Sequence, residues 1–186
     1  MKQILILLMT VLILNTVIAQ DNNRNQKLSY GFELRYLKTV DVGVDYLLGP
    51  NSDFPGAYGK SLRFNLGYFF NPHIYSGLSL GADRYEVAAA NTFPLAVNLR
   101  YYFKDARNTL YSFAEGGPNL AFSTASDKGY TSAIGLGYKF FISKRTCLTS
   151  SCGYNYEKSK LNRIDAAYIG NYLSRKSLLF SIGILF

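Results

Sequence analysis

The sequence contains few of the residues that bind metals or carry out acid–base catalysis. Its 186 residues include one histidine, His73, and two cysteines, Cys147 and Cys152. These three residues do not supply the ligand set of a zinc site, and no phosphate-binding loop or nucleotide fingerprint is present. On one extended strand the two cysteines would have Cα atoms about 16 Å apart, whereas a disulfide requires less than about 7 Å. We therefore expect free thiols and no catalytic, metal or cofactor-binding residues.

Long apolar runs are also missing, except near the start of the chain. Residues 4–18 are almost all apolar and follow a positively charged start, and Val17 and Ala19 occupy the −3 and −1 positions of a cleavage site. This is the pattern of a secretory signal peptide, and the run is too short for the roughly 20 apolar residues of a membrane anchor. We expect residues 1–19 to be removed and 20–186 to form one domain. No cysteine lies near the cleavage site, which argues against a lipoprotein.

Tryptophan is absent, but the chain contains 16 tyrosines, 13 phenylalanines and 16 glycines. Such a composition favours strands that tolerate crowding. The net charge of +8 comes from Lys and Arg residues dispersed along the chain, so a nucleic-acid partner is not expected. Contact with anionic lipopolysaccharide and a merely solvated surface are the two remaining interpretations.

Four segments alternate apolar residues with small or polar ones, which is the period of a β-strand. They cover residues 62–70, 95–103, 134–140 and 178–186. Each ends on an aromatic residue, and the spacing suggests a repeat of roughly 35 residues with one hairpin per repeat. These closing aromatics are Phe70, Phe103, Phe140 and Phe186.

Four further alternating segments, of which the first is clear and the last two are weaker, predict the antiparallel partners. They cover residues 28–37, 74–85, 110–121 and 146–157. The third contains Pro118, which predicts a bulge or the rim of a strand. Together these segments predict an all-β fold: an eight-stranded antiparallel up-and-down transmembrane β-barrel that follows a cleaved signal peptide.

The connections alternate in length, as they do in outer-membrane barrels, where short turns face the periplasm and long loops face outward. The short turns lie near residues 71–73, 104–109 and 143–145, and the long connections cover residues 38–60, 86–92, 122–129 and 158–171. Residues 42–47 either extend the first strand or form a hairpin in a loop. An even number of strands returns both ends of the barrel domain to the periplasmic side.

The polar face of the strands distinguishes a membrane barrel from a soluble one. In a soluble barrel this face would meet water and carry many Lys, Glu and Thr residues. Here it carries mainly Gly, Ser, Asn and Ala with isolated charges, which suits the narrow interior of eight strands. We expect Glu33 and Glu115 to pair with Arg35, Arg63 or Arg100 inside the barrel, the alternative being hydrated charges at the rim. The full set of expected lumen charges is Glu33, Arg35, Arg63, Arg100, Glu115 and Lys139.

Aromatic residues recur at both ends of the predicted strands, where they would form girdles at the two bilayer interfaces. One girdle would contain Tyr68, Phe70, Tyr101, Phe103, Tyr138, Phe140 and Phe186. The other would contain Tyr36, Tyr85, Phe93, Tyr130 and Tyr156.

With these patterns the chain resembles the small bacterial outer-membrane β-barrels of the OmpA-barrel or OmpX kind, often called porin-like. Its last strand resembles the C-terminal assembly signal of these proteins, carried by Phe180, Ile182, Ile184 and Phe186. The resemblance implies a monomer in the bacterial outer membrane of a Gram-negative envelope. It also implies contact with outer-membrane lipids and lipopolysaccharide, with the outer-membrane assembly machinery, and possible binding of a cell-surface ligand by the loops.

The resemblance does not fix the role of the barrel. We expect a structural or interaction protein with a side-chain-filled lumen; a small-solute porin is the alternative. A lipid A-modifying enzyme would require a catalytic histidine near the outer leaflet. His73 lies in a turn expected on the periplasmic side, so we expect no enzyme.

Overall fold

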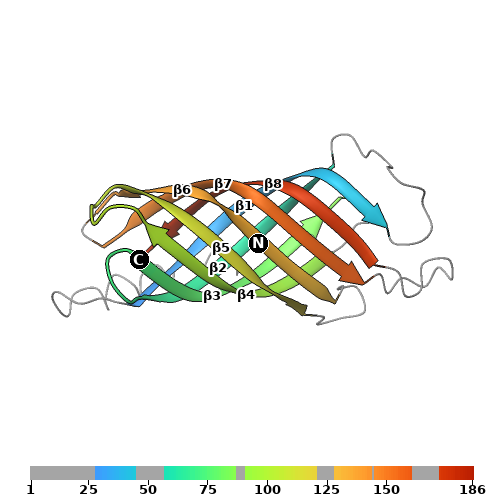
Figure 1. The fold of residues 1–186 in the computed structure, drawn as a ribbon, viewed down its shortest axis with the longest axis horizontal. Coiled ribbons are helices and arrows are strands. Elements are labelled where there is room, and N and C mark those ends of the chain that lie inside the picture. Colours follow the sequence, from blue (N-terminus) through green and yellow to red (C-terminus); the bar gives the residue numbers. More distant parts are fainter. Residues whose placement is uncertain (1–27, 45–56, 87–90, 121–127, 144, 161–171) are drawn as a thin grey trace, which may run out of the picture.

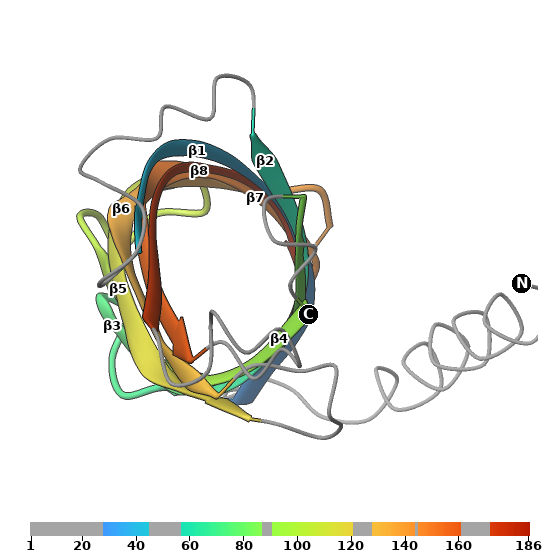
Figure 2. The ribbon, with the colours of Figure 1, turned by 90° about the vertical axis from the view of Figure 1, so that its right-hand side faces the viewer.

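The structure is a computed structural model, which describes residues 28–44, 57–86, 91–120, 128–143, 145–160 and 172–186. The predicted signal peptide, residues 1–19, lies outside the described residues. The described chain forms eight strands that close into one antiparallel barrel, each strand pairing with the next and the last with the first. Figure 2 shows the closed ring when the barrel is viewed from one end. The predicted eight-stranded barrel is confirmed.

The strands are 12 to 17 residues long, enough to cross a bilayer at the tilt of a barrel strand. No helix in the described part of the chain is long and apolar enough to span a membrane. The bounds of the strands are β1 Leu28–Val44, β2 Tyr58–Phe69, β3 Ile74–Tyr85, β4 Asn91–Tyr102, β5 Thr109–Leu120, β6 Gly129–Phe141, β7 Cys147–Lys160 and β8 Tyr172–Leu185.

The two ends of the barrel differ in their connections, as the sequence predicts. At the end on the left of Figure 1, which we call the turn end, short turns join β2 to β3, β4 to β5 and β6 to β7. The first turn is held by Asn71, whose side chain accepts hydrogen bonds from the backbone N–H groups of His73 and Ile74 at 2.8 Å. The connections at the opposite end, which we call the loop end, cover residues 45–57, 86–90, 121–128 and 161–171, and all but the second are longer than any of the three turns.

The wall separates an apolar outer face from a polar inner face. Outward side chains such as Ile182 and Leu34 are 67% and 66% exposed, although they are large and apolar. Their inward neighbours on the same strands include Ser181 and Arg35, which are buried. A soluble chain would bury the first set, so an exposed apolar band of this kind is the surface that a barrel presents to lipid.

All strands except β3 and β5 extend further toward the loop end than the predicted segments. β1 continues to Val44 instead of ending near Leu37, so Val42 extends the first strand, and residues 45–47 lie outside the described ranges. The pairing with β8 contains one register shift between Thr39 and Asp41, which marks a bulge. β7 likewise continues through residues 158–160, which the sequence assigned to a loop.

Pro118 lies within β5 and does not mark a bulge. The ladder between β4 and β5 pairs Pro94 with Asn119 and Val97 with Gly116; the residues between these two pairs are not paired, and the register does not change. Proline has no N–H to donate, so the ladder is interrupted beside it while both strands continue. The expected bulge at Pro118 is therefore absent, whereas the expected position near the rim is correct, since β5 ends two residues later at Leu120.

Cys147 and Cys152 lie on β7 as free thiols, one buried and the other exposed, as expected.

The aromatic girdles are confirmed for the outward residues of the turn end, such as Tyr101 and Phe103, which are about half exposed. Tyr85 is an exception, since it is 1% exposed and points into the lumen. In β3 the even-numbered residues Leu78 and Leu80 point outward, so the odd-numbered Tyr85 points inward.

Candidate functional site

The most distinctive site in the barrel is a set of ion pairs inside the lumen. Glu33 and Arg35 alternate on β1 and both point inward, where the Arg35 Nε donates to Glu33 Oε1 at 2.9 Å. The same guanidinium binds both carboxylate oxygens of Glu115, with Nη2 at 2.8 Å from Oε2 and Nη1 bonded to Oε1. Glu115 is on β5, four strands from β1 in either direction around the barrel. This bidentate pair therefore spans the lumen.

Arg100 on β4 connects the Arg35–Glu115 pair to other side chains of the lumen. Its Nη2 lies 3.4 Å from Glu33 Oε2, and its Nε donates to the side-chain oxygen of Asn98 at 3.0 Å. Asn98 in turn donates to Glu115 Oε2 at 3.1 Å. We call Glu33, Arg35, Asn98, Arg100 and Glu115 the central cluster. All five residues are buried, so the cluster lies in a site of low dielectric. Its two carboxylates and two guanidinium groups carry equal and opposite charge.

Aromatic rings fill the lumen on the turn-end side of the central cluster. The Arg100 guanidinium lies 5.4 Å from the ring centroids of both Tyr75 and Tyr111. Phe69 contacts Tyr75 and Tyr102 with centroid separations of 5.1 and 5.5 Å, and Tyr102 contacts Tyr111 at 5.3 Å. The sequence pattern predicted no such layer, because alternation alone does not show which inward rings come together across strands.

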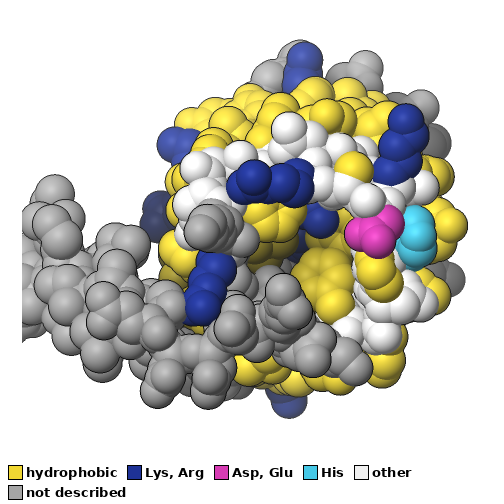
Figure 3. Space-filling view, turned by 90° about the vertical axis from the view of Figure 1, so that its left-hand side faces the viewer, with side chains coloured by type: hydrophobic (Ala, Val, Ile, Leu, Met, Phe, Trp, Pro, Cys, Tyr) yellow, Lys and Arg dark blue, Asp and Glu magenta, His cyan; other side chains and the backbone are white. Residues whose placement is uncertain are grey.

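Inward glycines leave the space that these rings occupy. A Cβ atom at Gly67 would overlap the ring of Tyr75, and one at Gly137 would overlap the ring of Tyr111. Gly67 and Gly137 therefore have a packing role, since each receives an aromatic ring from the adjacent strand. Figure 3 shows the turn end, where apolar side chains and lysine or arginine side chains surround the opening.

Lys139 belongs to this aromatic layer and not to the central cluster. Its Nζ lies 4.3 Å from the ring centroid of Tyr102 and 5.1 Å from that of Phe141. These are cation–π distances, and no carboxylate among the described residues forms an ion pair with it. The sequence placed Lys139 among the lumen charges but could not identify the rings as its neighbours.

A third layer of charges lies toward the loop end. Arg63 Nη2 bonds to Asp83 Oδ2 at 2.7 Å, so Arg63 pairs with a residue of the adjacent strand β3 and not with Glu33 or Glu115. Arg175 Nη1 lies 3.3 Å from Glu157 Oε1, and its guanidinium lies 4.5 Å from the centroid of Tyr85. Sequence reasoning missed Asp83, Glu157 and Arg175. They could have been found by extending the alternation of inward and outward residues in β3, β7 and β8 beyond the apolar band, since all three fall at inward positions.

The buried charges of the described lumen almost cancel. Four carboxylates, Glu33, Asp83, Glu115 and Glu157, accompany four arginines and Lys139. Each arginine contacts at least one of the carboxylates. A buried ion pair is costly to break, at about 3–5 kcal/mol when one partner is removed, so these pairs fix the lumen in one arrangement.

The other predicted residues lie outside the lumen. Phe180 and Ile182 point outward on β8 and are 50% and 67% exposed, and Ile184 and Phe186 are on the same outer face. His73 lies at the turn end, with Nδ1 2.7 Å from the backbone oxygen of Tyr102. Within the described ranges, no group of three or more His, Cys, Asp or Glu residues is arranged to hold a metal.

Comparison with known structures agrees with this architecture. The fold is similar to that of the outer membrane protein OprG from Pseudomonas aeruginosa, with a TM-score of 0.50 and 11% sequence identity over 85% of this chain and 93% of OprG. Weaker similarities are to a de novo designed transmembrane β-barrel (TM-score 0.45, 12% identity, 89% and 98% of the two chains) and to a FadL homologue of P. aeruginosa (0.34, 15%, 88% and 50%).

No protein-family model matches the sequence, and no curated protein matches it. The fold is that of a small outer-membrane β-barrel: a closed, eight-stranded antiparallel sheet with an apolar exterior and a charged, side-chain-filled interior.

Proposed function

We propose that this protein is an integral barrel of the bacterial outer membrane with a structural or interaction role at the cell envelope. The exposed apolar wall supports insertion into a bilayer, since it would otherwise be an aggregation-prone surface. Pairing of β1 with β8 leaves no free strand edge, which supports a monomer. The loop end then faces the exterior, where its connections are available to surface partners.

The observation that carries this proposal is the Arg35–Glu115 pair. Its two hydrogen bonds join opposite walls of the barrel and cross the path that a solute would follow. Arg100, Tyr102 and Lys139 occupy the lumen between this pair and the turn end. A barrel of eight strands has an interior just wide enough for side chains to fill. These contacts favour a closed lumen over a small-solute porin.

Planar-bilayer recording of the purified monomer tests the closed lumen. We expect no long-lived conductance from the wild-type barrel in neutral lipid. The positive control is a variant in which the spanning pair is removed together with its aromatic layer, Arg35→Ala/Glu115→Ala/Tyr102→Ala. A long-lived, nanosiemens-scale pore from the wild-type monomer would contradict the proposal and favour the porin alternative.

The proposal excludes a lipid A-modifying enzyme. His73, the single histidine of the sequence, is at the turn end, whereas the outer leaflet would surround the loop end. Its Nδ1 is engaged by the backbone oxygen of Tyr102, and its ring stacks on Tyr101 with a centroid separation of 6.0 Å. These contacts support a structural role for His73 in the turn. Unchanged lipid A mass spectra from cells with and without the protein would agree with this assignment.

A further inference from the structure

The outer wall changes from apolar to basic near the loop end. The outward residues of each strand can be followed from the turn end to the loop end. Along six strands, the first charged residue met on the outer face, on the strand or directly beside its end, is a lysine or an arginine. On β4 and β5 no outward charge is reached among the described residues. We call these cations the basic belt: Lys38, Lys60, Arg84, Lys128, Lys158 and Lys176.

The belt is most concentrated across β1, β2 and β3. Lys60 and Arg84 are directly opposite each other in the β2–β3 ladder, and Lys38 is diagonal to Lys60 across the β1–β2 ladder. Facing residues have Cβ atoms about 5 Å apart, and diagonal neighbours lie about 7–8 Å apart. Like charges in this arrangement repel, which destabilises the sheet unless an anion lies between them.

Protein groups do not supply that anion within the described part of the chain. No ion pair joins Lys38, Lys60 or Arg84 to a described carboxylate, whereas Asp41 pairs with Lys176 at 2.6 Å. The carboxylate of Glu86, next to the patch, interacts with the Tyr58 hydroxyl. Among the described residues these three cations therefore have no ion-pair partner, and the patch keeps a net positive charge beside the single carboxylate of Glu86.

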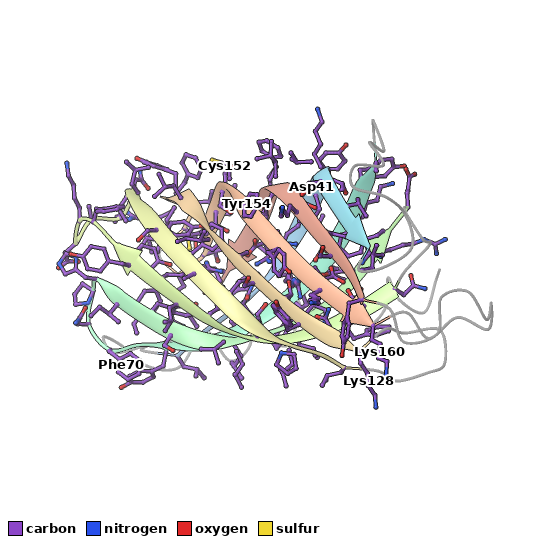
Figure 4. All side chains as sticks on the ribbon, turned by 45° about the vertical axis from the view of Figure 1, so that its right-hand side comes forward. Asp41, Phe70, Lys128, Cys152, Tyr154 and Lys160 are labelled. Atoms are coloured by element: carbon purple, nitrogen blue, oxygen red, sulfur yellow. The ribbon has the colours of Figure 1, made fainter. Side chains whose placement is uncertain are left out.

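Tyrosines mark the level of the membrane directly beside these cations. The rings of Tyr36 and Tyr58 stack with a centroid separation of 5.8 Å, and Lys60 Nζ lies 5.4 Å from the Tyr58 centroid. Tyrosine at the end of an apolar band is typical of the headgroup region of a bilayer. Figure 4 shows the belt residue Lys128 next to Lys160 at the loop end, far from Phe70 at the turn end.

We propose that Lys38, Lys60 and Arg84 form a binding site for the phosphate groups of a phosphorylated glycolipid, the lipid A portion of lipopolysaccharide, in the leaflet around the loop end. The acyl chains lie along the apolar wall below Tyr36 and Tyr58, and the phosphates lie between the three cations. This inference rests on the proposed outer-membrane location, which sets the lipid present at the loop end.

Native mass spectrometry of the folded barrel, titrated with diphosphoryl lipid A, tests the site. The variant Lys60→Gln/Arg84→Gln removes the facing pair, and Lys104→Gln/Arg107→Gln removes the same charge from the turn end. Because each basic residue at an anionic surface contributes about 1 kcal/mol, the first variant should bind about 30-fold more weakly. The turn-end variant should bind as the wild type does.

Several outcomes would overturn the inference. Equal affinity of the loop-end and turn-end variants would show that general charge, and not this site, holds the lipid. Equal binding of dephosphorylated lipid A with the same acyl chains would show that phosphate is not recognised. Inorganic phosphate, added at the same phosphate concentration as the lipid A, should not displace the lipid. Displacement would show that the site binds free anions and does not recognise the lipid.

A separate measurement distinguishes failure of this inference from failure of the proposed function. Both variants are first inserted into phosphatidylcholine vesicles, where the folded barrel is recognised by its shifted mobility on unheated gels. If the wild type does not insert, the membrane location is wrong. If all three proteins insert equally and lipid A binding does not differ, only the lipid site is wrong.

Discussion

Tyr30 and Phe186 close the barrel by joining the first strand to the end of the last. Each backbone N–H donates to the carbonyl of the other residue, at 3.2 Å from Tyr30 and 2.8 Å from Phe186. Their rings stack on the outer wall with a centroid separation of 5.6 Å and an interplanar angle of 24°. The seam between β1 and β8 is therefore fixed by backbone pairing and by an aromatic contact at the turn end.

A double-mutant cycle on Tyr30→Ala and Phe186→Ala should show that the rings are coupled. Aromatic pairs contribute about 0.5–1.5 kcal/mol beyond their buried area, and we expect a coupling of this size in the free energy of unfolding. Equilibrium unfolding in phospholipid vesicles measures it. The control cycle pairs Phe186→Ala with Tyr138→Ala, a ring of the same girdle on β6. A coupling no larger than in this control would mean that the stacking adds nothing to closure.

The seam also illustrates how far the fold could be predicted from the sequence. Outward residues such as Phe180 and Ile182 alternate with small inward ones, so the period of two identified the strands and the face of each residue. The prediction failed where both faces are polar, as in residues 158–160 of β7, because the alternation disappears beyond the apolar band.

The lumen was predictable only in part. Glu33, Arg35, Arg100 and Glu115 come together as expected, because inward charges in a narrow barrel must find partners. Which partner each finds depends on strand tilt and register, which a single sequence does not contain. Arg63 therefore pairs with Asp83, a residue that no pattern singled out. The rings around Lys139 escaped notice for the same reason.

The fit between glycines and rings predicts a position-specific effect of a single methyl group. Gly137→Ala should destabilise the barrel by about 1–3 kcal/mol, because the new Cβ would overlap the ring of Tyr111. In a Tyr111→Ala background the same change should be nearly neutral. Gly116→Ala is the control, since its Cβ would meet no atom closer than 3.7 Å. Unfolding in vesicles measures all four proteins, and an equal cost at Gly137 and Gly116 would rule out the packing role.

The two cysteines allow a direct test of which face meets lipid. Cys152 points outward from β7 beside Tyr154 (Figure 4), whereas Cys147 is buried. In the Cys147→Ser variant, a bimane fluorophore is attached to Cys152 while the protein is unfolded, and the protein is then refolded into vesicles. Nitroxides on the lipid acyl chains should quench the bimane fluorescence, whereas iodide in the aqueous phase should not. A bimane at position 128, introduced as Lys128→Cys in a cysteine-free protein, is the matched control at the loop end. Stronger iodide quenching at Cys152 than at position 128 would contradict the lipid-facing wall.

The final prediction concerns the energy of the pair that spans the lumen. Glu115→Gln should lower the free energy of unfolding by about 3–5 kcal/mol, because it leaves the Arg35 guanidinium buried with one of its two carboxylate partners removed.

Two other variants separate the pair from general effects of charge. Arg35→Met/Glu115→Leu removes both charges, leaves Glu33 with Arg100, and should recover much of the loss, since apolar replacement of a whole buried pair is often close to neutral. Asp41→Asn breaks the pair with Lys176 and should cost less than about 1 kcal/mol, because the side chains of Asp41 and Lys176 are 44% and 46% exposed. Urea unfolding in vesicles compares the three proteins with the wild type. If Glu115→Gln costs no more than Asp41→Asn, water reaches the Arg35–Glu115 pair, and the lumen is not closed by it.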